Sequence, residues 1–444
     1  MEPFLKKLEL AFEQFPVMSD SPGVAVAFSG GLDSSVLLTA LTRLELGRPI
    51  RALHIDHGLH PDAEKWAQHC RRIAADLGVL FDSQQVSIAK APGLSLEASA
   101  REVRYAALSG MMGPAELLLT AHHSDDQLET VLLRLLRGSG VKGLRGIAPF
   151  ARFGPGYLGR PLLAIAKQDI QSVATRWGLD WVEDPTNPDT RFDRNYLRRE
   201  VVPRLKQRWP GAAVTAGRAA RQMRDAQEIL DSAALADSAG NNVSGRVSQA
   251  ALRELTAARR ANLLRYRILE LGLAVPSAGQ LEKLLEALDV TRPDAQTQVQ
   301  WPGGECRIYR GELYLFRPMA PGSGPDYRGR LDHASSWNGP EGRLELCRTD
   351  GPGLPDSWVR QGLTIRFRVG GERFKPLDRA HSRKLKKWLQ LAGVVPWMRG
   401  RIPLLYRDDD LVAVADLWLS DDIRQAQAGE PVWQVNWTDH PTID

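Results

Sequence analysis

Residues 23–38, GVAVAFSGGLDSSVLL, decide the fold of this chain. The stretch opens with a short apolar run typical of a buried strand and ends with a segment of helical character, so a glycine loop joins a strand to a helix. Gly30 and Gly31 permit positive φ and a close approach of the backbone to a ligand. The N–H groups of such a loop and of the helix N-terminus form a site for an anion. The stretch therefore predicts phosphate binding at residues 29–34.

The side chains of the loop support this prediction. Ser29 and Ser34 add hydroxyl donors, and the Asp33 carboxylate suits Mg²⁺ or a hydroxyl group bound beside a phosphate. The Walker pattern GxxxxGK[ST] and the dinucleotide pattern GxGxxG are both absent from this loop. A plain glycine turn with a serine or aspartate helix cap is the alternative. Six matching residues between a strand and a helix favour the phosphate site.

The same alternation of strand and helix patterns continues to about residue 179. Strands that alternate with helices form βαβ units, so we expect an α/β fold, a Rossmann-like parallel sheet with helices on both faces. Ligands in such sheets bind at the carboxyl ends of the strands. The predicted strands are 23–30, 49–58, 79–88 and 115–123, and the predicted helices are 34–46, 62–77, 95–108 and 125–137.

Changes in composition divide the rest of the chain. We expect a catalytic domain at 1–212, a mainly helical middle domain at 213–350 and a small α+β C-terminal domain at 355–444 that contains a helix at 381–391. The net charge of the 444 residues is only +5, but residues 190–224 carry +8 and residues 360–407 carry +11. Two basic regions on an otherwise acidic chain are typical of a protein that holds a long polyanion at two points.

The composition also excludes several classes of protein. A hydrophobic content of 43% and a charged content of 25% are ordinary for a globular protein. The three cysteines form no C-x-x-C pair, which disfavours a disulfide framework and a cysteine zinc site. The first residues lack the layout of a signal peptide, and no apolar run reaches the ~18 residues of a membrane span. We therefore expect a cytoplasmic protein with no membrane partner.

Two further clusters contain candidate site residues. One ends the second predicted strand, and the other begins the third predicted helix. His54, Asp56 and His57 end the strand, where alternate residues face opposite sides, so they make a poor metal site. We expect them to contact the base or ribose of a nucleotide, with plain turn chemistry as the alternative. Glu97, Arg101 and Arg104 share one helical face. A solvated, ion-paired face is the alternative interpretation for this second cluster.

Residues 119–130, LTAHHSDDQLET, place three carboxylates beside two histidines. Asp125, Asp126 and Glu129 converge at one end of a helix for which Ser124 is the predicted cap. Simple capping is the alternative, because the helix dipole stabilises carboxylates at this end. A cationic amine or a metal ion would suit the cluster, and one carboxylate could act as a general base.

Arginines recur at helical spacing in the first basic region. Arg191, Arg194 and Arg198 lie within residues 190–224. A solvated face is the alternative to contact with the phosphates of ATP or of an RNA backbone.

Together these motifs resemble those of the tRNA(Ile)-lysidine synthetases, a branch of the pyrophosphatase-loop (SGGxDS) ATP pyrophosphatases. Four basic residues of the last domain, Arg373, Lys375, Lys384 and Lys386, are similar to the acceptor-stem-binding module of that family. Only the middle of the chain, about 215–350, matches weakly. The matching motifs are SGGLDS at 29–34, HIDHGL at 54–59, EASAREVRY at 97–105, HHSDDQLETVLLRLLRGSG at 122–140, RPLL at 160–163 and RNYLR at 194–198.

The resemblance implies ligation of L-lysine to C2 of the wobble cytidine in tRNA(Ile) with a CAU anticodon. ATP would adenylate O2 of that cytidine, and the lysine ε-amine would displace AMP, so that the lysidine product reads AUA instead of AUG. The implied cofactors are ATP and Mg²⁺, with Asp33 as the metal ligand. The implied catalytic residues are Asp33, Asp126, Glu129 and Arg101; those for ATP are Ser29, Gly30, Gly31, Leu32, Asp33, Ser34, His54, Asp56 and His57; those for the other substrates are Glu97, Arg104, His122, His123, Asp125, Arg191, Arg194, Arg198, Arg373, Lys375, Lys384 and Lys386.

Two alternatives remain open at this point. A tRNA base thiolase of the same superfamily would need cysteines to carry sulfur, and the cysteine pattern disfavours it. A non-enzymatic tRNA-binding protein would need only the basic regions, and five intact clusters argue against it. The expected partners are tRNA(Ile), L-lysine and, in a possible homodimer, a second copy of the chain.

Overall fold

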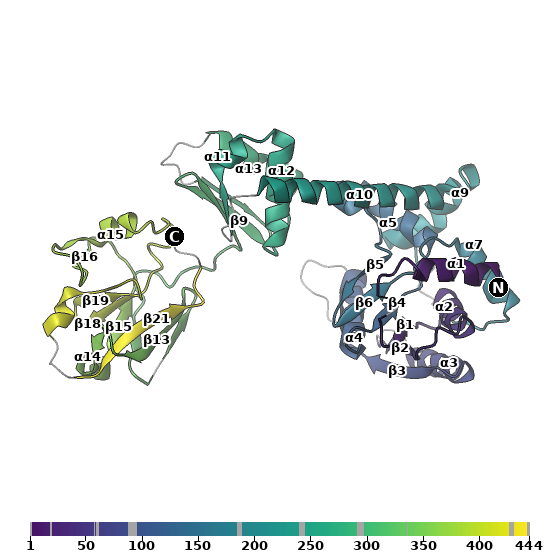
Figure 1. Ribbon diagram of the computed structural model, residues 1–444, viewed down its shortest axis with the longest axis horizontal. Coiled ribbons are helices and arrows are strands. Elements are labelled where there is room, and N and C mark those ends of the chain that lie inside the picture. Colours follow the sequence, from purple (N-terminus) through teal and green to yellow (C-terminus); the bar gives the residue numbers. More distant parts are fainter. Residues whose placement is uncertain are drawn as a thin grey trace. The chain divides into compact units, whose positions relative to one another are not determined.

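The structure is a computed structural model of the chain, and its contacts divide the chain into two compact units, Met1–Ser232 and Ala233–Asp444 (Figure 1). None of the helices among the described residues is long and apolar enough to span a membrane. The structure describes residues 2–17, 20–56, 58, 62–87, 96–183, 189–238, 245–290, 297–334, 336–425 and 430–441.

A six-stranded sheet forms the centre of the first unit, in the order β3-β2-β1-β4-β6-β5. Strands β3, β2, β1, β4 and β6 pair in parallel, whereas β5 pairs antiparallel with β6 at one edge. The predicted parallel sheet is therefore confirmed, and the four predicted strands are its first four. The bounds are β1 Val24–Ala27, β2 Ile50–Asp56, β3 Leu80–Gln85, β4 Leu117–Leu119, β5 Phe150–Phe153 and β6 Gly156–Gly159.

Helices cover both faces of this sheet, as predicted. Alternate residues of a strand point to opposite faces, and Val24 and Val26 of β1 pack in one core with Leu37 of helix α2. Ala25 of β1 packs in a second core with Leu108 of helix α4. The bounds are α1 Pro3–Phe12, α2 Leu32–Arg43, α3 Ala63–Asp76, α4 Leu96–Met111, α5 Ser124–Leu136, α6 Val141–Leu144, α7 Lys167–Arg176, α8 Asp193–Tyr196, the π-helical turn η1 Leu197–Val201, α9 Val202–Arg208 and α10 Ala212–Asp237.

The strand order places a ligand crevice between β1 and β4. The chain leaves β1 toward β2 on one side, and β4 lies on the other side of β1 with β6 beyond it. A sheet whose order reverses between two neighbouring strands opens a crevice at their carboxyl ends. The loop at residues 29–34 follows β1 and the segment at residues 120–123 follows β4, so both motifs meet at this edge.

The second unit begins with a helical part that also contains an antiparallel sheet, β7-β10-β9-β8. Its core is formed by helix residues such as Leu264 and Leu284 and by strand residues such as Ile308 and Leu313. The predicted mainly helical character of this part is confirmed, and an antiparallel sheet accompanies its helices. The bounds are β7 Arg246–Ser248, α11 Gln249–Arg253, α12 Ala257–Glu270, α13 Ala278–Val290, β8 Thr297–Trp301, β9 Gly304–Tyr309 and β10 Glu312–Phe316.

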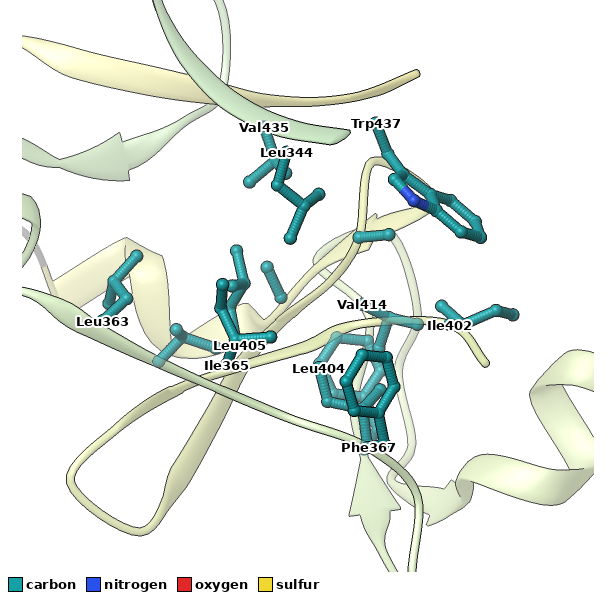
Figure 2. Packing of buried hydrophobic residues seen from close by; sticks show 14 of the residues in the cluster. Leu344, Leu363, Ile365, Phe367, Ile402, Leu404, Leu405, Val414, Val435 and Trp437 are labelled. Atoms are coloured by element: carbon teal, nitrogen blue, oxygen red, sulfur yellow. The ribbon is translucent and has the colours of Figure 1, made fainter. Parts of the chain in front are cut away.

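The last part of the chain is rich in strands, with two main sheets that face one another. Figure 2 shows Leu344 and Val435 of one sheet pointing toward Ile365 and Leu405 of the other. The sheets have the orders β12-β13-β21-β14 and β11-β15-β18-β19-β20, and β16 pairs with β17. The bounds are β11 Gly329–Leu331, β12 Trp337–Gly339, β13 Gly342–Thr349, β14 Leu354–Pro355, α14 Asp356–Gln361, β15 Leu363–Arg366, β16 Arg373–Phe374, β17 Arg383–Lys384, α15 Leu385–Leu391, β18 Leu404–Arg407, β19 Asp410–Val414, β20 Trp418–Leu419, the 3₁₀-helix η2 Asp421–Gln425 and β21 Val432–Thr438.

The helix predicted at 381–391 is shorter than expected. It begins at Leu385, because residues 383–384 pair with β16 instead, and the Leu385 N–H donates to the carbonyl of Glu372. Within this second unit, the Trp397 ring contacts the rings of Tyr314 and Phe316 of β10. The predicted domain limits at 212/213 and 350/355 stay predictions.

Candidate active site

The glycine loop after β1 is tied into a compact turn by its own side chains. The Ser29 and Ser34 hydroxyl groups lie 3.1 Å apart, and Ser34 Oγ donates to the carbonyl of Gly31 at 3.0 Å. Gly30 has a φ of +76°, and a Cβ atom there would lie 2.6 Å from the sulfur of buried Cys70. A side chain at this position is therefore excluded both by backbone strain and by the sulfur atom. Gly31 is the N-cap of α2, so the first turn of this helix follows the glycines directly.

The Asp33 carboxylate, in the first turn of α2, is held by a lysine. Lys167 Nζ donates to the two oxygens of Asp33 at 2.6 Å and 2.7 Å. Lys167 is the first residue of α7, where a positive charge opposes the helix dipole. The ion pair with Asp33 offsets this unfavourable position, and packing of α7 against α2 keeps the two residues together.

His123 lies between the loop and the acidic cluster of α5. Its Nε2 is 3.8 Å from an oxygen of Asp33 and 3.5 Å from an oxygen of Asp126. Its backbone N–H donates to Asp126 at 2.9 Å, so His123 caps α5 and the predicted cap at Ser124 is wrong by one residue. The aspartate is the acceptor in this cap, because its carboxylate reaches back to the orphan N–H group of the residue before the helix.

His122, the residue before His123, has a different partner. Its Nδ1 lies 2.8 Å from the hydroxyl oxygen of Thr120. Burial lowers the pKa of His122 to about 3, so its imidazole is neutral at neutral pH.

Two buried carboxylates of α5 bind two arginines of the basic segment. Glu129 accepts from Arg194 Nε at 2.9 Å and from Arg198 Nε at 2.7 Å. Asp126 accepts from Arg194 at 2.9 Å and from Arg198 at 3.2 Å. The side chain of Glu129 is 1% exposed, so this four-membered cluster is shielded from water on the carboxylate side.

The charges around Asp126 keep it ionised. Burial raises the pKa of Asp126, but His123, the Arg194 guanidinium and the backbone N–H of His123 outweigh burial and bring this pKa to about 2. Two carboxylates and two guanidinium groups give the cluster no net charge. Charge balance of this kind is what a buried ionic cluster requires.

The residues from 193 to 208 form a helical run with one face turned to α5. Arg194, Leu197, Arg198 and Val202 recur on this inner face, and Lys206 ends it with an ion pair to Asp125. The three carboxylates that the sequence places together at the start of α5 are therefore all paired with basic residues of this run. Arg191 instead pairs with Asp189 at 2.7 Å, and its side chain is 88% exposed.

Arg101 and Arg104 of α4 lie beside Tyr105. The Arg101 guanidinium is 4.9 Å from the centre of that ring and donates to its hydroxyl group at 3.3 Å. Burial lowers the pKa of Arg104, whose guanidinium lies 5.7 Å from the same ring. The side chain of Glu97 lies outside the described residues.

The residues at the end of β2 include one that contacts the residue before the glycine loop. His54 is buried, its Nδ1 lies 2.9 Å from the carbonyl oxygen of Phe28, and burial lowers its pKa. Asp56 accepts the N–H of Gly58 at 2.8 Å, as in a turn. These contacts fit the turn chemistry that was the alternative for this cluster, and the nucleotide role stays a prediction. His57 lies outside the described residues.

The four basic residues predicted in the last domain belong to the second unit and gather around β16 and β17. Lys375 pairs with Asp421 at 2.7 Å, and Arg373 donates to the carbonyl of Ser382 at 3.2 Å. Lys384 and Lys386 are exposed. Their role in binding RNA stays a prediction.

Lys167 and Lys206 are site residues that the sequence reasoning missed. A lysine at the first position of α7 opposes the helix dipole, and that conflict is a signal that Lys167 needs an anionic partner. Lys206 continues the i, i+4 series of Arg194 and Arg198 after one apolar member, Val202.

Comparison with known proteins agrees with this arrangement. Residues 4–205 match the model of the PP-loop domain, an ATP-binding family, residues 248–314 match the TilS substrate binding domain, and residues 363–437 match the TilS substrate C-terminal domain. The tRNA(Ile)-lysidine synthase of Methylococcus capsulatus is 37% identical over 93% of this chain and 95% of its own length. That of Alkalilimnicola ehrlichii is 40% identical over 90% of this chain and 91% of its own length, and that of Coxiella burnetii is 37% identical over 94% of each. With a PP-loop site at the β1/β4 crevice and relatives matched along nearly their whole length, the chain belongs to the tRNA(Ile)-lysidine synthase family of ATP-dependent ligases.

Proposed function

We propose that this chain ligates L-lysine to C2 of the wobble cytidine in tRNA(Ile) with a CAU anticodon. The observation that carries the proposal is the position of His123, within 4 Å of both Asp33 of the glycine loop and Asp126 of the acidic cluster. The ATP-binding loop and the proposed site for the cationic amine therefore share one crevice. The two half-reactions need this proximity, because the adenylated base must be attacked where it is formed.

In the first half-reaction, O2 of cytidine attacks the α-phosphorus of ATP, and the bond to the β-phosphate breaks to release pyrophosphate. Ser29, Ser34 and the N-terminus of α2 would hold the phosphates, since they supply hydroxyl and N–H donors at one point. Lys167 and Arg101 would neutralise the charge that develops on the leaving group. Gly30, Gly31 and Leu32, which are also predicted to contact ATP, belong to the same loop.

Magnesium fits the Asp33 side of the crevice. The described residues contain no group of three or more His, Cys, Asp or Glu side chains that could hold a metal alone. Mg²⁺ commonly binds to one or two carboxylates together with substrate phosphates, so the single carboxylate of Asp33 suits it. A bound magnesium ion would screen the charge of the triphosphate there.

In the second half-reaction, the lysine ε-amine attacks C2 and the C2–O bond to AMP breaks. The amine is protonated at neutral pH, so it must lose a proton before it attacks. Asp126 and Glu129 are the proposed partners of the ammonium group, with Asp126 as the proposed proton acceptor. Because both carboxylates are bound to Arg194 and Arg198 in this structure, the lysine ammonium group must share or replace one of these guanidinium contacts.

One assay tests the proposal. Purified protein, ATP, Mg²⁺, labelled lysine and the CAU-anticodon tRNA(Ile) should transfer label to RNA and release AMP and pyrophosphate. Asp33→Ala should abolish pyrophosphate release while tRNA still binds. Transfer of sulfur from a donor, with no incorporation of lysine, would show a thiolase instead, and RNA binding without any ATP cleavage would show a binding protein.

A further inference from the structure

Aromatic rings are exposed on the outer face of the helical run 193–208. Phe192, which caps the run, is 39% exposed, and Tyr196, one turn later, is 50% exposed. Arg199 is exposed three residues after Tyr196. We define the outer face by these three residues. Two aromatic rings four residues apart lie on one side of a helix, and neighbouring exposed apolar side chains mark an interaction site more often than a single one does.

The opposite face of the same run is the wall of the proposed active site. Arg194 and Arg198 lie on that inner face and hold Asp126 and Glu129. The outer face is therefore about 10 Å, one helix diameter, from the carboxylates.

The end of α5 extends the outer face. Arg137, the C-cap of α5, pairs with Asp193, the first residue of α8, at 3.1 Å. Leu136, beside Arg137, is 74% exposed and adds an apolar side chain at this end of α5. The surface thus combines aromatic and aliphatic side chains with arginines.

We infer that the outer face is a stacking platform for the unpaired nucleotides that flank the target base. Aromatic rings stack on bases irrespective of sequence, and nearby arginines contact the phosphates, which is the chemistry that binds single-stranded RNA. The basic balance of residues 190–224 opposes a hydrophobic protein partner, whose interface core is depleted of charge. The inference rests on the proposed function, because it places the anticodon loop next to the site of ligation.

Binding of a short RNA tests the platform directly. The probe is a stem–loop RNA with CAU in its loop, and the reference is a blunt duplex with the same stem. Tyr196→Ala should weaken binding of the stem–loop by roughly fivefold to a hundredfold and leave duplex binding unchanged, whereas Tyr196→Phe should bind like the wild type. Leu80→Ala, which removes a 66% exposed side chain from β3, is the matched surface control.

The salt dependence separates the two kinds of contact. Arg199→Gln should reduce the slope of log affinity against log salt by about one, and Tyr196→Ala should leave that slope unchanged. Melting temperature and ATP binding, measured on each variant, verify that the fold and the loop are intact. Equal stem–loop affinity for wild type and Tyr196→Ala overturns the inference, and so does a wild-type dimer that Tyr196→Ala converts to a monomer without a change in RNA affinity. If wild-type protein labels tRNA with lysine in that case, the proposed function stands while the platform fails; if wild-type protein neither labels tRNA nor binds the stem–loop, both fail.

Discussion

Lys167 donates to both carboxylate oxygens of Asp33, at 2.6 Å and 2.7 Å, across 134 positions of sequence. The pair joins the helix after the glycine loop to a helix that follows the last strand of the sheet. It therefore places a positive charge beside the first turn of α2, next to the predicted ATP site.

Replacement of Lys167 should weaken the binding of ATP. We expect Lys167→Gln to raise the Kd of Mg·ATP by roughly tenfold to a hundredfold, because a charge-assisted contact to phosphate is lost. Isothermal titration of the purified variant measures this Kd. Lys7→Gln is the matched control, since Lys7 forms an exposed ion pair with Asp169 of the same helix. An unchanged Kd for Lys167→Gln would show that the lysine serves Asp33 alone.

The buried cluster of α5 should contribute strongly to stability. Glu129→Gln leaves Arg194 and Arg198 with one charged partner instead of two, and disruption of a buried ionic cluster typically costs about 3–5 kcal/mol. We expect the first unit to melt at a clearly lower temperature in this variant, as followed by calorimetry. Asp193→Asn breaks the exposed pair with Arg137 and should cost less than about 1 kcal/mol. Similar losses in the two variants would contradict the cluster's structural role.

Local sequence patterns specify part of this site but not the orientation of its arginines. The strands, the loop and the start of α5 follow from local patterns, and Gly30 and Ser34 lie as expected. The direction in which Arg194 and Arg198 point depends on how the run 193–208 packs on α5, and no pattern within that run specifies it. The same periodic spacing fits a face turned to solvent, to RNA or to Glu129.

The pairing of Asp33 with Lys167 was out of reach for a different reason. The two residues are far apart in sequence, and the order of strands β1, β4 and β6 brings them together. The information lies in long-range pairing and not in local propensity.

His122 should make the protein less stable in mild acid. Burial lowers its pKa to about 3, whereas an unfolded histidine has a pKa of about 6.5. Between these values the unfolded chain binds a proton that the folded protein does not, so stability falls as pH falls through this window, by up to about 1.4 kcal/mol per pH unit. His122→Gln keeps a hydrogen-bonding side chain near Thr120 and removes the titration. We expect the melting temperature of this variant to decline less than that of the wild type between pH 6.5 and pH 4, and parallel curves would contradict the assignment.

Lys384 and Lys386 should contribute to tRNA affinity in a salt-dependent way. Both are exposed, unlike Lys375, whose charge is already paired with Asp421. Each phosphate contact adds about 0.7–0.9 to the slope of log affinity against log salt, so Lys384→Gln combined with Lys386→Gln should lower that slope by about 1.4–1.8. The affinity for ATP should not change, because these residues belong to the second unit and the glycine loop to the first. Lys65→Gln, at an exposed position paired with Asp62, serves as the control, and an equal slope in the double variant and this control would show that the last domain does not hold the RNA through these lysines.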